Sequence, residues 1–549
     1  AALAFTNNNV NGLMTVGRNS VLSLGTDDTG KAEQAFAESE LTWGKTGVSA
    51  ALYIDQAQKL QVQGGILLDG TKTAASAEAN KASFADGSLL IVNGSGIGTS
   101  GTAALTGGSG STLTVNQGAK LYLTSTNAGT YTIAKGFANT TIDGWSWSAD
   151  AAAVDVSVNK LSEIEKIEKN TADGDFTVTV RQTDVQKKYD GIALPNILQA
   201  MDQSRTEYAG IKYLTDLAND NKLDKEGFIA AVNSFAQGAE NSGATRTGAL
   251  AALDLGTAVQ EHLSLVKAAE EQSGGFGKAA VDTADNGGIW AQYIHNKDKV
   301  DNMGGVSYDG QYNGVIIGGD FADRGKYSSG IAFSYGSGDS TGSASKNEFD
   351  FWGLSYYGGI QNGDTNLIFD VGYSKTSSDV KGVIKAEPDT QVISMGIKGE
   401  KVISNGHGTS YVPYAGLRYM NIDTDSYNGS IDGKTAAHYS TDKADLWLLP
   451  VGISISHESV TAGGWKVRPT ADIAYVWTLG DKNTAMDITV PGVNATDRLG
   501  YDIMDSGFFV GKLGLEAEKG DWTYGLGYAC QKGSHAQNSK FMLNVTYSF

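Results

Sequence analysis

The strongest constraint on the fold of this chain is a two-residue alternation of apolar and polar side chains that continues through most of residues 286–549. Side chains two apart lie on one face of a β-strand, so each alternating run predicts a strand with two unlike faces. Many of the twelve runs have 10–15 residues, above the roughly 5–6 of a soluble strand. The runs lie near 287–297, 310–321, 326–338, 347–361, 364–378, 389–403, 408–422, 441–457, 464–478, 507–518, 521–531 and 538–549.

Charged residues in the middle of the polar faces indicate which way the sheet faces. A dry core would demand a partner for each charge, whereas a wet or helix-filled lumen would not. In lipid every backbone polar group must be paired, so the sheet must close, and an even number of strands permits antiparallel closure. We therefore predict an all-β-dominated fold with a 12-stranded antiparallel transmembrane β-barrel rather than a soluble one. The predicted lumen-facing residues are Lys466, Arg468, Asp472, Lys512 and Glu516.

Aromatic residues near the ends of the runs suit the interfacial girdles of a membrane barrel. Examples are Trp290, Trp447, Trp477, Trp522 and Phe549. The last segment, KFMLNVTYSF, alternates up to the final residue. Its apolar face holds Phe541, Leu543, Val545, Tyr547 and Phe549. A C-terminal strand that ends on Phe resembles the signal that outer-membrane barrels present to the barrel-assembly machinery.

Directly before the barrel, residues 245–285 are predicted to hold a long helix and a connection. The helical pattern runs from about Thr245 to Gln272, before Ser273-Gly274-Gly275, and much of its surface is small. A slim helix of roughly 40 Å, at ~1.5 Å per residue, suits the inside of a narrow barrel. The alternative is a packing helix in a bundle. The residues of the predicted pore helix that we single out are Ala249, Ala252, Gly256 and His262.

Residues 1–158 are rich in Gly, Ser, Thr, Ala and Asn and contain a repeated pair of short apolar runs. The three copies are Met14-x-Val16 with Leu22-x-Leu24, Leu52-x-Ile54 with Leu60-x-Val62, and Leu113-x-Val115 with Leu121-x-Leu123. Repeats of this kind predict a β-helix or solenoid, with Trp145-Ser146-Trp147 at its end, and a β-sandwich is the alternative. Residues 159–244 form a mixed strand and helical linker region. There Leu161, Ile164 and Ile167 have helical spacing, and Asp175–Gln182 is a predicted strand.

Short motifs in the barrel resemble those of a known family. Gly288-Ile289-Trp290-Ala291-Gln292 is similar to the Gly-x-Trp start of autotransporter translocators, and Gly318-Gly319-Asp320-Phe321 is like the family's second strand. With twelve strands, a preceding helix and an N-terminal repeat region, the chain resembles the autotransporter, or type V secretion, family. One subgroup of the family cuts off its passenger at an Asn-Asn pair in the pore helix. Thr245–Gln272 contains no Asn, so this cleavage is not expected here.

The resemblance implies a location and a set of partners. The barrel, a monomer, is expected in the bacterial outer membrane, where lipid surrounds it. The N-terminal passenger is expected at the cell surface, with the helix left in the lumen. The barrel-assembly machinery and periplasmic chaperones are the implied partners in assembly. The extracellular ligand of the passenger stays unidentified.

Composition and motifs argue against several kinds of chemistry. A net charge of −19 argues against nucleic-acid binding, which needs a basic face. The six histidines and one cysteine show no metal-ligand spacing, so no metal or cofactor is expected. Gly96-x-Gly98-x-x-Gly101 matches a dinucleotide fingerprint formally, but a helix is not predicted to follow it. No catalytic set is visible, and we do not expect an enzyme.

We therefore expect an autotransporter that exports and anchors its own β-helical passenger, which serves as an adhesive or structural surface module. One alternative is a porin-like channel whose N-terminal region is a plug or periplasmic domain. Another is a soluble β-solenoid enzyme such as a polysaccharide lyase, whose charged cleft should recur on stacked strands. The small-residue helix before the first barrel strand is the feature that favours the first of these.

Overall fold

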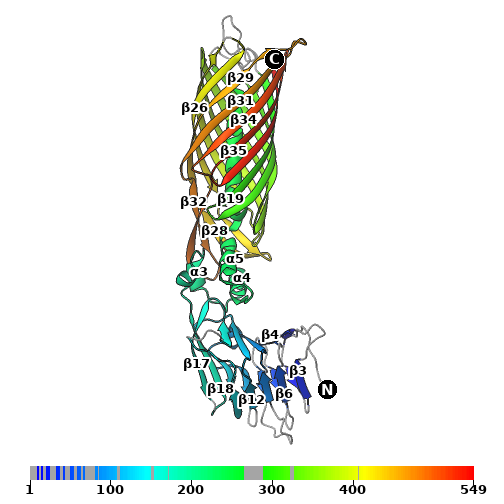
Figure 1. The fold of residues 1–549 in the computed structure, drawn as a ribbon, viewed down its shortest axis with the longest axis vertical. Helices are drawn as coiled ribbons and strands as arrows, with labels where there is room; N and C mark the ends of the chain where they lie inside the picture. Colours follow the sequence, from blue (N-terminus) through cyan, green and yellow to red (C-terminus); the bar gives the residue numbers. More distant parts are fainter. Residues whose placement is uncertain are drawn as a thin grey trace. The chain divides into compact units, whose positions relative to one another are not determined.

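The computed structural model describes residues 86–264 and 288–548, except for 108–111, 150–153, 171, 322–326 and 406. N-terminal to residue 82 it describes only the backbone of the strands, and residues 82–84 are described in full. The chain forms two compact units: residues 1–232 with 490–495, and residues 233–489 with 496–549. Each unit is considered separately (Figure 1).

Three parallel sheets form the N-terminal unit, because strands three apart in sequence pair with one another. The first sheet contains β1 (Asn9–Asn11), β4 (Glu33–Ala37), β7 (Lys59–Val62), β10 (Leu89–Asn93), β13 (Lys120–Thr124) and β16 (Val156–Val158). The second contains β2 (Met14–Val16), β5 (Leu41–Trp43), β8 (Ile66–Leu68), β11 (Ala103–Gly107) and β14 (Gly129–Lys135). The third contains β3 (Ser20–Leu24), β6 (Ala50–Ile54), β9 (Lys81–Phe84), β12 (Thr112–Val115) and β15 (Asn139–Ile142). This is the coil-on-coil stacking of a parallel β-helix.

The predicted repeat is only partly aligned with these coils. Leu22 pairs with Leu52, Leu52 with Ala82, and Ala82 with Leu113, so each coil places one of these residues in the same sheet. The second and third copies of the repeat are structurally equivalent. The first copy is displaced by one strand, because Met14–Val16 lies in the second sheet and not the third. The apolar two-residue spacing is the same on all three sheets, so spacing alone did not reveal this offset.

The C-terminal end of the coil stack is covered by antiparallel strands and an aromatic plug. β18 (Asp175–Gln182) and β17 (Ser162–Asn170) continue the second sheet beyond β14. The predicted strand at Asp175–Gln182 is therefore present, whereas the helical spacing of Leu161, Ile164 and Ile167 was misleading, because Ser162–Asn170 is a strand. A bulge between Ile164 and Lys166 explains the three-residue spacing. Trp145 is fully buried between Phe84 and Phe176, with ring centroids 5.1 and 5.3 Å away.

The short helix α1 (Gly94–Ile97) interrupts the coils. After the coil stack come α2 (Val185–Lys188), α3 (Pro195–Ala200), α4 (Ala209–Asn219) and α5 (Lys225–Gln237). A 3-10 helix, η1 (Gly238–Ser242), leads to α6 (Ala244–His262). The predicted pore helix ends earlier than expected, because Leu263 has left the helical conformation and residues 265–285 lie outside the described part. Among the described residues, no helix is long and apolar enough to cross a membrane.

Twelve long antiparallel strands form a closed barrel in the C-terminal unit. They are β19 (Gly288–Met303), β20 (Val306–Asp320), β21 (Tyr327–Gly342), β22 (Ser345–Asn362), β23 (Thr365–Gly382), β24 (Asp389–Lys401), β26 (Thr409–Thr424), β29 (Ala444–His457), β31 (Lys466–Gly480), β34 (Gly507–Lys519), β35 (Trp522–Lys532) and β36 (Ala536–Ser548). The first strand, β19, pairs with the last, β36, which closes the ring. All twelve predicted strands are present. Two short strands add to this sheet: β25 (Ile403–Ser404) pairs with β26, and β30 (Ser459–Val460) pairs with β31.

A second, four-stranded sheet extends from one end of the barrel and was not predicted. Its strands are β27 (Tyr427–Ile431), β28 (Lys434–Thr441), β32 (Asn483–Thr489) and β33 (Thr496–Asp502), in the order β27-β28-β32-β33. The two hairpins come from different loops of the barrel, and β28 pairs with β32 to join them. Asp432 and Gly433 both have positive φ, as the two central residues of a tight hairpin turn require.

The barrel has an apolar outer surface and a polar inner surface. On β34 the outward residues Phe509 and Leu513 are 61% and 65% exposed, whereas the inward Glu516 is 9% exposed. Trp447, Trp477 and Trp522 also lie on the outside. Trp290 does not: it is 4% exposed and points into the lumen, so its predicted place in the girdle was wrong. The outer surface is the kind that lipid solvates.

Candidate functional site: the helix-filled lumen

The lumen of the barrel is occupied by α6, which runs through it between the strands (Figure 1). Its N-terminal end lies among the turns of the barrel, where Ser340 Oγ donates to Ser242 O at 2.6 Å. Its C-terminal end lies near the other barrel end, where Asn366 Nδ2 donates to Leu263 O at 2.9 Å. The chain therefore enters the lumen at the end opposite Ser548, and α6 spans the space between.

Small residues let α6 approach one wall of the barrel closely. Ala249 and Ala252 are 0% and 4% exposed, and a Cβ built on Gly248 would lie 2.7 Å from Thr390 Cγ2. Leu255, Val259 and Leu263 belong to a cluster with Ile316, Ala332 and Ile368. All four residues singled out in the predicted pore helix lie on α6: Ala249, Ala252, Gly256 and His262. The small side chains thus place the helix against β22, β23 and β24.

The first turn of α6 is fixed by a buried arginine. Arg246 Nε and Nη2 donate to the two carboxylate oxygens of Asp298 on β19, at 2.8 and 3.0 Å. Arg246 Nη1 donates to Ile503 O at 2.9 Å. Both side chains are less than a tenth exposed, so the pair is a desolvated, bidentate contact, the strongest geometry for this pairing.

Asp254, two turns further along α6, accepts from three strand residues. Lys540 Nζ on β36 binds Asp254 Oδ1, and Tyr312 Oη and Asn296 Nδ2 donate to Oδ2 at 2.6 and 3.2 Å. The exposed fraction of Asp254 is 6%, and that of Lys540 is 6%. A buried lysine of this kind needs a charged partner, and the helix supplies it.

A second buried arginine lies beside the middle of α6. Arg418 on β26 donates to both oxygens of Asp370 on β23, at 2.8 and 2.9 Å, and to Ser394 Oγ at 2.6 Å. Gln260 Nε2 of the helix donates to Asp370 Oδ1 at 2.8 Å. The ion pair needs room that only Gly256 leaves, since a Cβ there would lie 2.1 Å from Arg418 Nη1.

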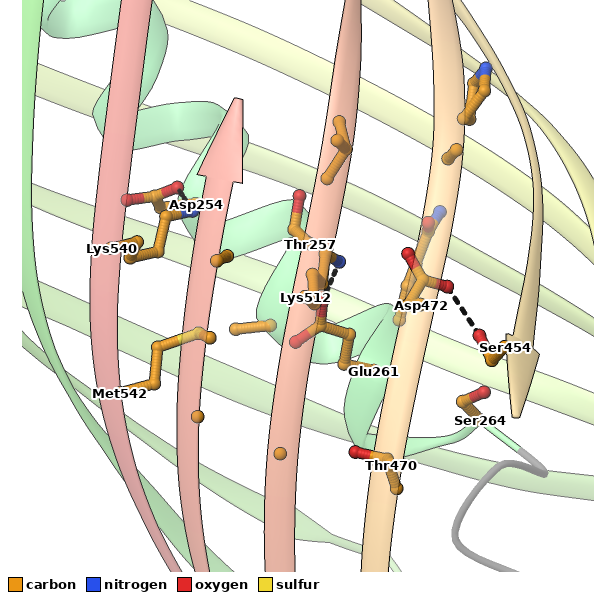
Figure 2. Close-up of a pocket in the computed structure, with 18 of the residues that line it drawn as sticks. Asp254, Thr257, Glu261, Ser264, Ser454, Thr470, Asp472, Lys512, Lys540 and Met542 are labelled. Atoms are coloured by element: carbon orange, nitrogen blue, oxygen red, sulfur yellow. Dashed lines mark hydrogen bonds and ion pairs between the residues drawn. The ribbon is translucent and has the colours of Figure 1, made fainter. Parts of the chain in front are cut away.

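Between α6 and the barrel wall a cavity of about 230 Å³ remains (Figure 2). Its lining comes from the helix and from β19, β24, β26, β29, β31, β34, β35 and β36. Glu261 binds Lys512 of β34 there. Asp472 of β31 accepts from Ser454 Oγ at 2.5 Å and from Tyr414 Oη at 3.1 Å. Both acidic and basic side chains line the cavity, so it has no single sign of charge.

An aromatic and histidine cluster holds the last turn of α6. His262 stacks on Trp290 with ring centroids 4.7 Å apart, and His262 Nε2 lies 2.9 Å from Asp320 Oδ2. Tyr357 Oη donates to Asp320 Oδ1 at 2.7 Å, and Trp290 Nε1 donates to Tyr357 Oη at 2.8 Å. Three strands are thereby joined to the helix end.

The predicted lumen-facing residues lie on β31 and β34. Arg468 is 3% exposed and binds Glu458 at 2.7 Å and Glu516 at 3.1 Å. Lys466 lies at the strand start, 3.6 Å from Glu518, with a side chain 41% exposed. Lys512 and Asp472 line the cavity described above. Of these predicted residues, Lys512 contacts α6, whereas Arg468 and Glu516 bind within the wall.

The predicted C-terminal signal lies on the outside of β36. Phe541, Leu543 and Val545 are 38%, 44% and 38% exposed, and Tyr547 is partly exposed. Phe549 lies outside the described residues. Several polar partners of the helix were not predicted from sequence, among them Asp298, Asp370 and Lys540. They occupy inward positions in alternating runs, which identifies the face but not the partner.

The lumen therefore contains a helix bound near its start, its middle and its end by buried or half-buried polar contacts. Among the described residues, no group of three or more His, Cys, Asp or Glu side chains has the geometry to hold a metal ion. These carboxylates instead bind arginines, lysines and hydroxyls of the helix and of the wall. Such an arrangement binds a polypeptide segment inside the barrel and narrows the passage through it.

Comparison with known proteins identifies one matching family and several similar solved structures. The family model described as the autotransporter beta-domain matches residues 289–529. A search of curated proteins finds no match. Among solved structures, the translocator domain of the autotransporter NalP from Neisseria meningitidis is 14% identical, with a TM-score of 0.42, and the match covers 57% of this chain and 100% of that one.

Two further solved structures are similar at a comparable level. The beta domain of the Bordetella autotransporter Brka is 16% identical, with a TM-score of 0.39 and coverage of 48% of this chain and 100% of that one. The transport unit of AIDA-I from Escherichia coli is 15% identical, with a TM-score of 0.37 and coverage of 48% and 90%. The family model, together with the closed twelve-strand ring, decides the assignment. The C-terminal barrel of this chain belongs to the autotransporter beta-domain family, and it resides in the bacterial outer membrane.

Proposed function

We propose that this autotransporter exports its own N-terminal β-helix and anchors it at the cell surface. The observation that carries the proposal is the path of the chain: everything N-terminal to α6 is joined to the first barrel strand through the lumen. A segment held in this way has one end at each mouth of the barrel. The N-terminal region is then attached outside while the barrel stays in the membrane.

The passenger is proposed to be an adhesive or structural module and not an enzyme. Its described core is filled by apolar side chains such as Leu90, Val92, Leu121 and Leu123, all fully buried. Short parallel strands stacked in three sheets give an elongated, repetitive surface, which suits binding to an extended partner. The Asn-free pore helix supports a passenger that stays attached.

Protease treatment of intact cells that express the full chain tests the location of both parts. We expect loss of the N-terminal β-helix and survival of the barrel as a protected fragment. Cells opened before treatment serve as the control for protease access. An N-terminal region that is digested only in opened cells would place it in the periplasm and contradict the proposal.

Folding of the passenger is expected to assist its display. Leu121→Asp and Leu123→Asp place charges in the fully buried interior of β13, and we expect slower appearance of the passenger at the surface. Lys120→Asp on the same strand is the matched control, because Lys120 is exposed. Equal display rates for the three variants would show that passenger folding does not drive export.

A porin-like channel is the second candidate, and the lumenal cavity is the observation that favours it. Conductance in planar bilayers separates the two functions. We expect low conductance for the full chain and a large increase after deletion of Ala244–His262, because the helix occupies the lumen. High conductance with α6 in place would favour the channel. A second variant that keeps the length of the helix is Glu261→Lys, which places a second positive charge beside Lys512.

A further inference from the structure

The barrel has one boundary that differs from all the others. Neighbouring strands around the ring are consecutive segments of the barrel, except at the pairing of β19 with β36, which joins its two ends. We call this boundary the seam. Consecutive strands are held near each other by their connections, whereas the seam strands must find each other across the whole barrel sequence. The seam therefore depends more than other boundaries on contacts made after closure.

Two residues of α6 bind lumen-facing side chains of the seam, and we call the six residues involved the seam network. Arg246 binds Asp298 of β19, and Asp254 binds Asn296 of β19 and Lys540 of β36. Asn538 Nδ2 of β36 donates to Asn296 Oδ1 at 2.6 Å. The seam network is Arg246, Asp254, Asn296, Asp298, Asn538 and Lys540, and each of its residues is less than a tenth exposed.

The register of the seam shows why this network joins the two strands. Asn296 is directly opposite Lys540, and Asp298 is directly opposite Asn538. Both members of the first pair bind the same carboxylate, that of Asp254, so the helix bridges the boundary at one level. The second pair, two residues along on the same face, includes the aspartate that binds Arg246. Two adjacent cross-strand pairs are thus connected through the helix.

We propose that α6 holds the seam closed, so that the presence of the helix in the lumen controls lateral opening of the barrel between β19 and β36. This inference rests on the geometry of the barrel and the helix, and it stands whether or not the N-terminal region is exported. Removing the carboxylate of Asp254 leaves Lys540 buried beside Asn296 without its charged partner. The strand that carries Lys540 is then expected to separate from β19 first.

Hydrogen–deuterium exchange of the full chain in detergent micelles measures this opening strand by strand. In Asp254→Asn we expect exchange of backbone amides in β19 and β36 to accelerate about tenfold, with little change in β22 to β24. Glu261→Gln is the matched control, because it removes a carboxylate of the same helix whose lysine partner lies on β34, away from the seam. It should leave β19 and β36 as protected as in the unchanged protein.

A double variant distinguishes two effects of Asp254→Asn: the loss of the contact across the seam, and the destabilisation caused by an unpaired buried lysine. Asp254→Asn with Lys540→Met has no buried unpaired lysine, but it still lacks the contact across the boundary. We expect faster exchange at the seam in this variant as well, and it also serves if the single variant does not fold. Full protection of β19 and β36 in the double variant, or equal loss of protection in all twelve strands, would overturn the inference.

Discussion

Gly256 of α6 lies directly against the guanidinium of Arg418, where a Cβ atom would stand 2.1 Å from Nη1. Arg418 is bound to Asp370 by two hydrogen bonds of 2.8 and 2.9 Å, so it cannot move aside without losing a buried ion pair. We predict that Gly256→Leu lowers the thermal unfolding temperature of the barrel, although a residue other than Gly favours a helix by about 1 kcal/mol. Circular dichroism in detergent micelles measures it. Thr257→Leu, which faces the cavity, is the control and should unfold near the unchanged temperature.

The ion pair itself gives a second prediction. Asp370 is 1% exposed, and Asp370→Asn leaves the guanidinium of Arg418 buried without a counter-charge. We expect a loss of about 3–5 kcal/mol in the free energy of unfolding. Urea titration in micelles measures it. Asp364→Asn is the control: the side chain of Asp364 is 45% exposed and pairs with Lys401. This variant should lower the free energy of unfolding by about 1 kcal/mol or less. Similar losses in both variants would contradict a special role for the buried pair.

The orientation of the tryptophans predicts their contact with lipid. Variants that keep one tryptophan each, with the others changed to Phe, are reconstituted in bilayers that contain brominated lipid. Bromine should quench Trp477 and Trp522, which are 42% and 44% exposed on the outside. Trp290, stacked on His262 in the lumen, should not be quenched. Quenching of Trp290 at the level of Trp477 would mean that the inward face had been assigned to the wrong side.

The buried carboxyl of Glu240 in η1 predicts that the stability of the folded state depends on pH. It is 4% exposed, and burial raises the pKa of its carboxyl from 4.5 to about 7, although Thr245 donates to it at 2.8 Å. The folded state holds this proton more tightly than the unfolded state, so the contribution to stability is full below about pH 4.5 and falls as the pH rises through 7. Thermal unfolding between about pH 5 and pH 8 should therefore show a decline that is smaller in Glu240→Gln. A decline of the same size in that variant would assign the effect to another group.

Much of the barrel could be predicted because lipid imposes a simple rule on its strands. One face must be apolar along the whole span, and the two-residue period follows for every strand. The start of α6 was predicted within a residue, because its small side chains set it apart. Its end was not, because helical spacing continues past His262 while the chain leaves the helix at Leu263.

Contacts in the lumen could not be predicted, for a physical reason. In β19 the inward positions include Trp290 and Ile294 and the outward ones include Ile289 and Tyr293, so both faces contain apolar residues and the period does not identify the lumen. The pairing of Asp254 with Lys540 depends on residues 286 apart in sequence. Strands β27 and β28 were missed because Gly, Asp and Thr give their segments the composition of a loop.

The sheet formed by β27, β28, β32 and β33 has a consequence for resistance to cutting. Loops of a barrel ordinarily come away once a protease has cleaved them. Here a cut at Asp432-Gly433 would leave two ends that are each still hydrogen-bonded to a neighbour, because β28 pairs with both β27 and β32. The nicked chain would migrate as fragments only after denaturation, and the intact rim would persist until then.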